Sequence, residues 1–245
     1  MTILLEVCVD SPAGLAAAIE GGADRIELCA ALDVGGLTPS PGLMALAARA
    51  PIPVHALVRP RAGSFIFGSD DEAAMAADID AALTAGLAGV VIGASREDGR
   101  LDTAMLARLK TVAGEAGVTL HRAFDLVPDM DIALEQAIDL GMERILTSGG
   151  RLTAIEGADE ITRLMKKAAS RIRIMPGSGL RPDNVDHLLR CGVGDVHASC
   201  RRAILADPDD RATAFGFQSK EAFATDADIV RQMRARLDGW RDDNK

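Results

Sequence analysis

Short apolar runs recur along the chain, and each run begins a few residues after a glycine. A glycine at such a position supplies the left-handed residue that ends a helix, so that an apolar strand can follow closely. The pattern reads GGADRIELC from Gly21, AGLAGVVIG from Ala85, AGVTLHRAF from Ala116, LGMERILTS from Leu140 and CGVGDVHAS from Cys191. Together with the apolar runs between these copies, it predicts strands near 3–9, 24–29, 53–59, 88–93, 118–123, 143–147, 172–176 and 194–198.

Helix signals fill the intervals between these strands. Ser11-Pro12 and Ser40-Pro41 each place a capping hydroxyl before a proline whose fixed φ suits the first helical position. Between residues 161 and 168 the apolar side chains recur at three- and four-residue spacing, as on one face of a helix. A last helix is predicted near 220–238, after an acidic segment at 207–210 that we expect to be a surface turn.

The alternation of strands and helices, in units of roughly 30 residues, predicts a parallel sheet covered by helices. About 250 residues is the usual size of a closed (β/α)₈ barrel, the TIM barrel, and this chain has 245. No segment has the length or low complexity of a linker, so the sequence predicts a single domain over residues 1–245. A doubly wound open sheet is the alternative topology, although it offers no natural place for the polar strand residues described below.

Composition narrows the possible function classes. The formal net charge of -9 opposes binding to nucleic acid phosphates and to anionic membranes, and no uncharged stretch reaches the roughly 20 residues of a bilayer span. The first ten residues lack a basic segment, so they are predicted to form a strand and not a signal peptide. We therefore expect a cytoplasmic protein in which the four cysteines stay reduced.

Strand alternation predicts which side chains face the barrel axis. Helices cover the outer surface of a parallel barrel, so the apolar side of each strand must face outward. In the first strand this rule places Leu5 and Val7 outside and turns Glu6 and Cys8 inward. The inward set is mostly polar and consists of Glu6, Cys8, Asp10, Arg25, Glu27, Cys29, His55, Leu57, Arg59, His121, Asp125, His197 and Ser199.

Two interpretations of the inward set remain open. The groups can form a satisfied, ligand-free core, although the desolvation of buried charges tends to offset their attraction. Alternatively they form a site, because barrel interiors are usually filled by branched aliphatic side chains. Glu27, His121 and Asp125 are then the candidates for general acid–base catalysis, since a carboxylate beside an imidazole orients it and tunes its pKa.

Two glycine-containing turns predict an anion site. The turns TSGG at 147–150 and PGSG at 176–179 follow the sixth and seventh predicted strands. Backbone N–H groups at this end of a barrel often hold a phosphate or carboxylate, and ordinary tight turns are the alternative. The predicted anion-binding residues are Arg59, Arg61, Ser148, Gly149, Gly150, Gly177, Ser178 and Gly179.

The sequence resembles the CutC family in seven segments. These are LEVCVDS at 5–11, GGADRIELC at 21–29, GGLTPS at 35–40, RPR at 59–61, HRAFD at 121–125, LTSGG at 146–150 and IMPGSG at 174–179. The resemblance is strongest over residues 4–201. It implies a TIM barrel, a cytoplasmic location, homo-oligomeric assembly and a role in copper homeostasis.

The resemblance also implies metal ligands. Cys8 and Cys29 match the cysteines proposed as copper ligands in the family, whereas Cys191 and Cys200 match no such proposal. Two thiolates suit Cu(I), which prefers soft donors, although free cysteines often serve as small buried hydrophobes. The chain departs from the family pattern at Ala62, where a glycine is usual. It departs again at Ser178, which interrupts a triple glycine.

Three functions remain open at the level of sequence. The first is a copper-handling protein, with Cu(I) as its only expected cofactor. The second is a barrel enzyme that acts on a small phosphorylated or carboxylated metabolite by general acid–base chemistry. The third is a non-catalytic scaffold. The expected partners are therefore a copper ion or a small anionic metabolite, with neither nucleic acid nor membrane among them.

Overall fold

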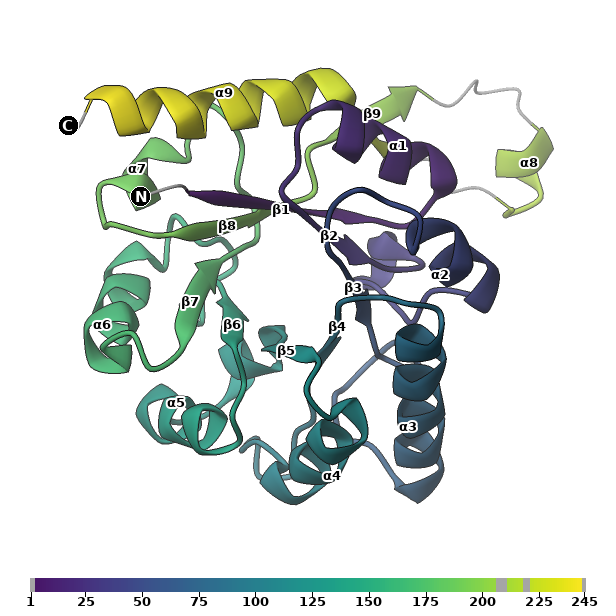
Figure 1. Ribbon diagram of the computed structural model, residues 1–245, viewed down its shortest axis with the longest axis vertical. Helices are drawn as coiled ribbons and strands as arrows, with labels where there is room; N and C mark the ends of the chain where they lie inside the picture. Colours follow the sequence, from purple (N-terminus) through teal and green to yellow (C-terminus); the bar gives the residue numbers. More distant parts are fainter. Residues whose placement is uncertain (1–2, 206–210, 218–220, 244–245) are drawn as a thin grey trace.

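Parallel strands surround a central axis in the computed structural model, and helices form an outer layer around them (Figure 1). The structure describes residues 3–205, 211–217 and 221–243. Hydrogen-bonded neighbours follow the order β7-β6-β5-β4-β3-β2-β1-β8 in one eight-stranded sheet. Among the described residues β7 and β8 adjoin without a ladder between them, so the barrel is nearly closed. This architecture confirms the predicted TIM barrel.

The elements alternate as the glycine and apolar pattern predicts. The barrel strands are β1 (Leu4–Val9), β2 (Arg25–Leu28), β3 (Val54–Leu57), β4 (Gly89–Ile92), β5 (Gly117–Leu120), β6 (Arg144–Thr147), β7 (Arg173–Pro176) and β8 (Asp195–Ala198). The helices are α1 (Pro12–Glu20), α2 (Pro41–Ala47), α3 (Ser69–Thr84), α4 (Thr103–Ala113), α5 (Met130–Asp139), α6 (Ala158–Ala168), α7 (Asp186–Leu189), α8 (Arg211–Ala214) and α9 (Ala227–Asp243). Two 3₁₀ turns, η1 (Leu32–Val34) and η2 (Arg122–Leu126), follow β2 and β5, and an outlying pair of strands consists of β9 (Arg201–Leu205) and β10 (Glu221–Thr225).

Both predicted proline-containing helix starts are confirmed. The Ser11 side chain accepts a hydrogen bond from the N–H of Gly14, and the Ser40 side chain accepts one from the N–H of Leu43. A proline occupies the first turn of each helix. None of the described helices is long and apolar enough to cross a membrane.

The chain between β8 and the last helix differs from the prediction. β10 pairs antiparallel with β9, so the backbone of residues 221–225 is extended and not helical. The last helix begins at Ala227, where the Asp226 carboxylate accepts the N–H groups of Asp228 and Ile229. A helix start near residue 220 is therefore wrong. The predicted turn at 207–210 lies outside the described residues.

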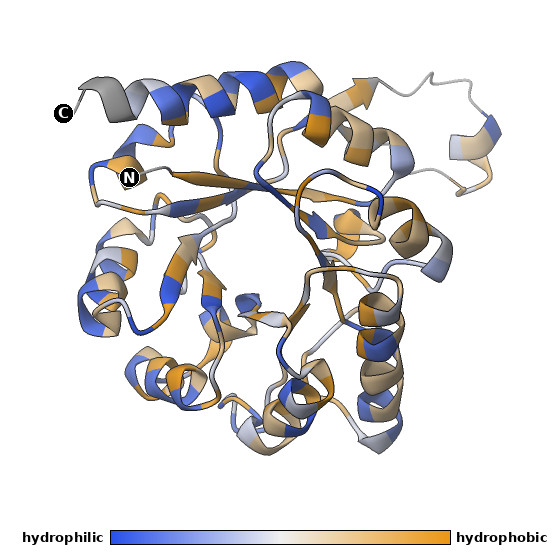
Figure 2. Cartoon of the chain, in the orientation of Figure 1, coloured by the Kyte–Doolittle hydropathy of each residue, from blue (hydrophilic) through white to orange (hydrophobic). Residues whose placement is uncertain are grey.

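Strand alternation separates an apolar outer layer from a polar interior. Leu5 and Val7 on β1 and Ile26 and Leu28 on β2 are completely buried in the main hydrophobic core. Figure 2 shows strands that are mostly apolar with hydrophilic positions between them, inside a ring of helices of mixed colour. The hydrophilic strand positions are therefore the ones available to the barrel interior.

Two glycines leave room for imidazole rings inside the barrel. A Cβ on Gly93 would collide with the His121 ring, and a Cβ on Gly89 would lie 2.8 Å from Cε1 of His55. Any larger residue at either position would therefore displace a ring or the strand beside it. The glycines of β4 and its end thus make a polar interior possible.

A buried ion-pair network lies among β1, β2 and β8. Arg25 Nε lies 2.5 Å from Glu6 Oε2, and Arg25 Nη2 lies 3.1 Å from Asp195 Oδ2. The strand register brings these groups together, because Glu6 lies opposite both Arg25 and His197 in the two flanking ladders. Each of the three ionic side chains is buried. Such charges persist in an interior only when they are paired and hydrogen-bonded.

We expect Arg25→Met to lower the free energy of unfolding by about 3–5 kcal/mol, because Glu6 and Asp195 would stay buried without a counter-charge. Urea unfolding followed by circular dichroism measures this loss. Arg108→Met is the matched control, since it removes an exposed pair with Glu72, a type of contact worth about 1 kcal/mol or less. Equal losses in the two variants would show that the Arg25 network contributes no more than a surface pair.

Candidate functional site

A cavity of about 710 Å³ opens at the carboxyl ends of the barrel strands, and we call it the mouth cavity. Cys8, Glu27 and His197 contribute to it from β1, β2 and β8, and the loops after β3, β5, β7 and β8 provide much of its wall. This volume lies within the range of pockets that hold small-molecule ligands. The cavity lies at the end of the barrel that the sequence predicts for the site.

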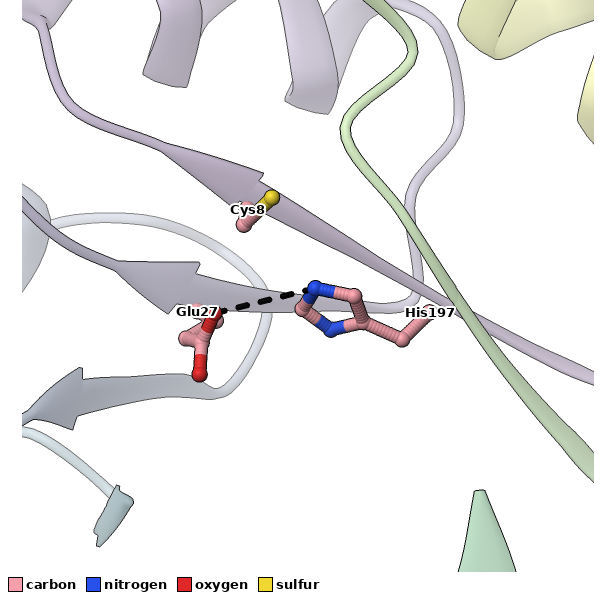
Figure 3. Close-up of side chains that lie close together, drawn as sticks. All are labelled: Cys8, Glu27 and His197. Carbon is pink, nitrogen blue, oxygen red and sulfur yellow. Dashed lines mark ion pairs between the residues drawn. The ribbon is translucent and has the colours of Figure 1, made fainter. Parts of the chain in front are cut away.

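Cys8, Glu27 and His197 form a compact cluster at the floor of the mouth cavity (Figure 3). One potential ligand atom from each residue lies within 4.8 Å of the others. His197 Nε2 is 3.7 Å from Glu27 Oε2, whereas Nδ1 is 2.8 Å from Glu6 Oε1. Glu6 thus fixes the ring from behind, as carboxylates commonly do for imidazoles that bind metals or move protons.

Burial and neighbouring charges shift the pKa values of this cluster in different directions. Burial alone would lower the pKa of His197, but the Cys8 sulfur and the Glu27 and Glu6 carboxylates raise it well above its usual value. Burial would raise the pKa of Glu6, but the hydrogen bond to His197 and the charge of Arg25 hold it far below its usual range. Burial dominates at Glu27 and raises the pKa of that carboxyl. The cluster therefore combines an ionised carboxylate, a charged imidazole and a second carboxyl that holds its proton more tightly.

The two thiols that match the proposed copper ligands differ in access. Cys8 lines the mouth cavity, whereas Cys29 is completely buried and packs in a small apolar cluster with Cys8 and Leu57. The Cys29 thiol lies 3.6 Å from Glu27 Oε2. Burial and the charge of Glu27 raise the pKa of Cys29 well above its usual value. Cys200 also lines the cavity, and burial raises the pKa of its thiol to about 12.

His121 lies on the wall of the mouth cavity. Its Nδ1 accepts the N–H of Ala123 over 3.1 Å, and its ring centroid is 4.7 Å from that of Phe65. Its Nε2 is buried and has no hydrogen-bond partner within the described residues. Burial and the nearby charge of Arg59 lower the pKa of His121 to about 3. At neutral pH the ring is therefore neutral, with its proton on Nε2 because Nδ1 acts as the acceptor.

Asp125 binds the turn after β6. Its carboxylate accepts the N–H groups of Ser148 over 3.0 Å and Gly150 over 3.1 Å, together with the Thr147 hydroxyl. Arg122 Nε completes the contacts at 2.7 Å. The N–H groups of Ser148 and Gly150 therefore hold a carboxylate of the protein itself. These hydrogen bonds direct Asp125 toward this turn and Arg122 and not toward His121 or Glu27.

The turn after β7 differs from the turn after β6. The Gly177 N–H donates to the Thr147 carbonyl over 3.0 Å, and the Ser178 hydroxyl donates to the Leu152 carbonyl over 2.8 Å. Ser178 and Gly179 both adopt a positive φ and line the mouth cavity. Their own N–H groups have no acceptor within the described part of the chain. Of the two predicted anion turns, this is the one that combines cavity-lining residues with N–H groups lacking an acceptor among the described residues.

The other predicted site residues lie in separate places. Arg59 lines the mouth cavity, but its guanidinium also donates to three backbone carbonyls. Arg61 pairs with Asp71 at 2.9 Å and is not part of the cavity lining. Ser199 lines the cavity, while His55 is buried beside the guanidinium of Arg144 at 3.3 Å.

Comparison with known proteins assigns the chain to a family. The profile of the CutC family matches residues 3–202. The chain belongs to the CutC family. A family protein CutC from Rhizobium meliloti (strain 1021) is 58% identical over 237 residues, which cover 96% of each chain. A family protein CutC from Caulobacter vibrioides (strain NA1000 / CB15N) is 52% identical over 239 residues, covering 95% of this chain and 98% of that one.

A solved CutC structure from Streptococcus agalactiae has a TM-score of 0.77 and 30% sequence identity to this chain. The match covers 80% of this chain and 98% of that one, and that protein is assigned to copper homeostasis. Membership of the CutC family supports the same broad assignment for this protein. The resemblance expected from the sequence motifs is therefore confirmed.

Strand alternation does not identify three arginines on the wall of the mouth cavity of this CutC protein. Arg122, Arg181 and Arg201 come after β5, β7 and β8, so the alternation within the barrel strands does not place them: Arg122 begins η2, Arg181 lies in a loop and Arg201 begins β9. Apart from the HRAFD segment that contains Arg122, their signal in the sequence is that they come shortly after the end of a barrel strand. That position is the usual origin of functional residues in TIM barrels.

Acid is expected to destabilise this CutC protein through its buried neutral histidines. Burial lowers the pKa of His55 to about 4 and that of His121 to about 3, from an ordinary value of 6.5. Below pH 6.5 the unfolded chain therefore binds more protons than the folded chain. The free energy of unfolding should then fall by up to about 1.4 kcal/mol per pH unit for each histidine. His197 has a raised pKa, so its contribution persists in acid and is lost only as pH rises through its folded pKa.

Urea unfolding at several pH values between about 6.5 and 5 measures this slope. His55→Gln should make the slope shallower, because the variant has no titrating group at that position. His187→Gln should leave it unchanged, since His187 is exposed. Equal slopes in the wild-type protein and His55→Gln would contradict the prediction.

Proposed function

We propose that this CutC protein acts in copper homeostasis by binding Cu(I) at the floor of the mouth cavity. The observation that carries the proposal is the cluster of Cys8, Glu27 and His197, whose ligand atoms lie within 4.8 Å of one another beside a cavity. The family assignment supports copper as the metal. A cytoplasmic location, homo-oligomeric assembly and a single domain over residues 1–245 stay predictions.

The donor chemistry of the floor suits Cu(I). Soft thiolate is a preferred donor for Cu(I), and imidazole is a common copper ligand. Cys8 would supply sulfur directly from the cavity lining. His197 would supply Nε2 after losing the proton on that nitrogen, while Glu6 holds Nδ1. Cys29 would be the second thiolate, after losing the proton that faces Glu27. Copper binding should therefore release protons and weaken in acid.

Cu(I) titration in competition with a chromophoric chelator tests this proposal. We expect Cys8→Ser to abolish measurable binding and Cys29→Ser to weaken it, because serine oxygen is a poor ligand for a soft cation. Cys191→Ser is the matched control, since that thiol is not among the residues of the cavity wall. Zn(II) should bind more weakly than Cu(I), because the floor does not offer the closed tetrahedral set of a structural zinc site.

Unchanged Cu(I) affinity in the Cys8→Ser/Cys29→Ser double variant would exclude these ligands. Equal losses in Cys191→Ser and Cys8→Ser would show that copper binds to accessible thiols in general. Either result would leave the family assignment intact and overturn the site. The variants should be compared after circular dichroism has shown the same secondary structure in each.

A second candidate function is a barrel enzyme that acts on a small anionic metabolite. The observation that favours it is the size of the mouth cavity, about 710 Å³, because a single metal ion needs far less space. Glu27 and His197 would exchange protons with such a substrate at the floor, and His121 would donate a hydrogen bond from the wall. Asp125 would act indirectly, by holding Arg122 at the cavity.

A further inference from the structure

The wall of the mouth cavity is rich in positive charge although the whole chain is acidic. Arg59, Arg122, Arg181 and Arg201 line the cavity, in a protein with a formal net charge of -9. The acidic lining groups are Glu27, which faces His197 at 3.7 Å, and Asp183, which pairs with Arg181 at 3.2 Å. Outside the lining, Asp125 pairs with Arg122 at 2.7 Å and Asp33 pairs with Arg201 at 3.5 Å. Arg59 is therefore the lining arginine without a carboxylate partner among the described residues, and its charge favours an anion where the field of the whole protein opposes one.

A buried donor without a partner belongs to a residue of the same wall, His121. The His121 side chain is buried, with only 5% of its surface exposed. Its Nε2 has no hydrogen-bond partner within the described residues. The other ring nitrogen already accepts the Ala123 N–H, so Nε2 must carry the proton and donate. A buried donor without an acceptor is costly in a folded protein, at about 1–3 kcal/mol. Because Nε2 is closed to solvent in this structure, a ligand oxygen in the mouth cavity would satisfy it once the ring turned toward the cavity.

Backbone donors lie on another part of the same wall. The N–H groups of Ser178 and Gly179 lack an acceptor in the described chain, and both residues line the cavity. Arg181 follows them in the same loop and also lines the cavity. The corresponding turn after β6 already binds a carboxylate, that of Asp125, through its own N–H groups. The turn after β6 thus shows how backbone N–H groups bind a carboxylate in this protein, and the turn after β7 has N–H groups without such a partner.

We propose that the mouth cavity binds a small organic oxyanion, a carboxylate or phosphate ester. The anionic group would lie against Arg181 and the N–H groups of Ser178 and Gly179. A hydroxyl or carbonyl oxygen of the same molecule would accept a hydrogen bond from His121 Nε2. This inference gives a substrate class to the second candidate function, on which it rests, and it does not depend on copper.

The binding of inorganic phosphate and of succinate to the full-length protein tests the inference. Calorimetry and thermal unfolding should be measured at constant ionic strength against chloride, because a bound anion stabilises the folded state. We expect both probes to bind the wild-type protein and to raise its unfolding temperature. Tighter binding of phosphate would identify a phosphate ester as the ligand class, and tighter binding of succinate would identify a carboxylate.

Two variants locate the site. Arg181→Ala should weaken anion binding about ten-fold, the usual effect of losing one charge-assisted hydrogen bond. Arg96→Ala is its matched control, because Arg96 is an equally exposed arginine that pairs with a neighbouring aspartate and lies outside the cavity wall. His121→Asn should weaken succinate binding and spare the fold, because the asparagine oxygen can still accept the Ala123 N–H. If that variant fails to fold, the Arg181 and Arg96 pair still decides the question.

The outcomes separate the inference from the functions proposed above. Absence of anion binding at millimolar concentrations, or equal losses in Arg181→Ala and Arg96→Ala, would overturn the inference and leave Cu(I) binding untouched. Turnover is measured in a separate experiment. The wild-type protein is incubated with a mixture of phosphorylated and carboxylated metabolites, and NMR detects whether any of them is converted. Anion binding without any turnover would support the oxyanion site and count against the enzyme.

Discussion

The arrangement of the whole floor depends on one buried guanidinium. Arg25 lies between the carboxylates of Glu6 and Asp195, and so joins β2 to its neighbour β1 and to β8, the next strand beyond β1. Without this charge neither carboxylate would tolerate the interior. The hydrogen bond to His197 and the charge of Arg25 together keep Glu6 ionised. Glu6 therefore holds Nδ1 of His197 and turns Nε2 toward Glu27 and Cys8. The Arg25–Glu6 ion pair thereby fixes the orientation of the His197 ring at the floor of the mouth cavity.

Strand periodicity predicts the barrel and the residues of its floor, because both follow from local rules. Parallel strands buried on both faces have only two sides, and the apolar side must meet the helices. That rule selects Glu6, Cys8, Glu27 and His197 as inward residues without any knowledge of distance, and the register then joins them across three strands. It does not distinguish Cys8, which lines the cavity, from Cys29, which lies behind it, because strand parity carries no information on depth.

The loops were beyond prediction for a physical reason, since their conformation is decided by tertiary partners. Nothing in the residues of the TSGG turn indicates that Asp125, far away in the sequence, would occupy its N–H groups. The same holds for β10, whose sequence can form a helix but pairs with β9 in the folded chain. Arg181 and Arg122 approach the cavity only because of how their loops return over the barrel, which no periodic pattern records.

Floor and wall of the mouth cavity differ in the ligand that each stabilises. Arginines on the wall raise the free energy of a bare cation in the cavity, so a soft metal at the floor must gain its affinity from bonds to sulfur and nitrogen. An oxyanion gains instead from the field of those arginines and from fixed N–H donors of Ser178 and Gly179. The two ligands would use different atoms, Cys8 and His197 in one case and the β7 loop in the other. Their affinities are therefore separable, and each site can be altered without removing the donors of the other.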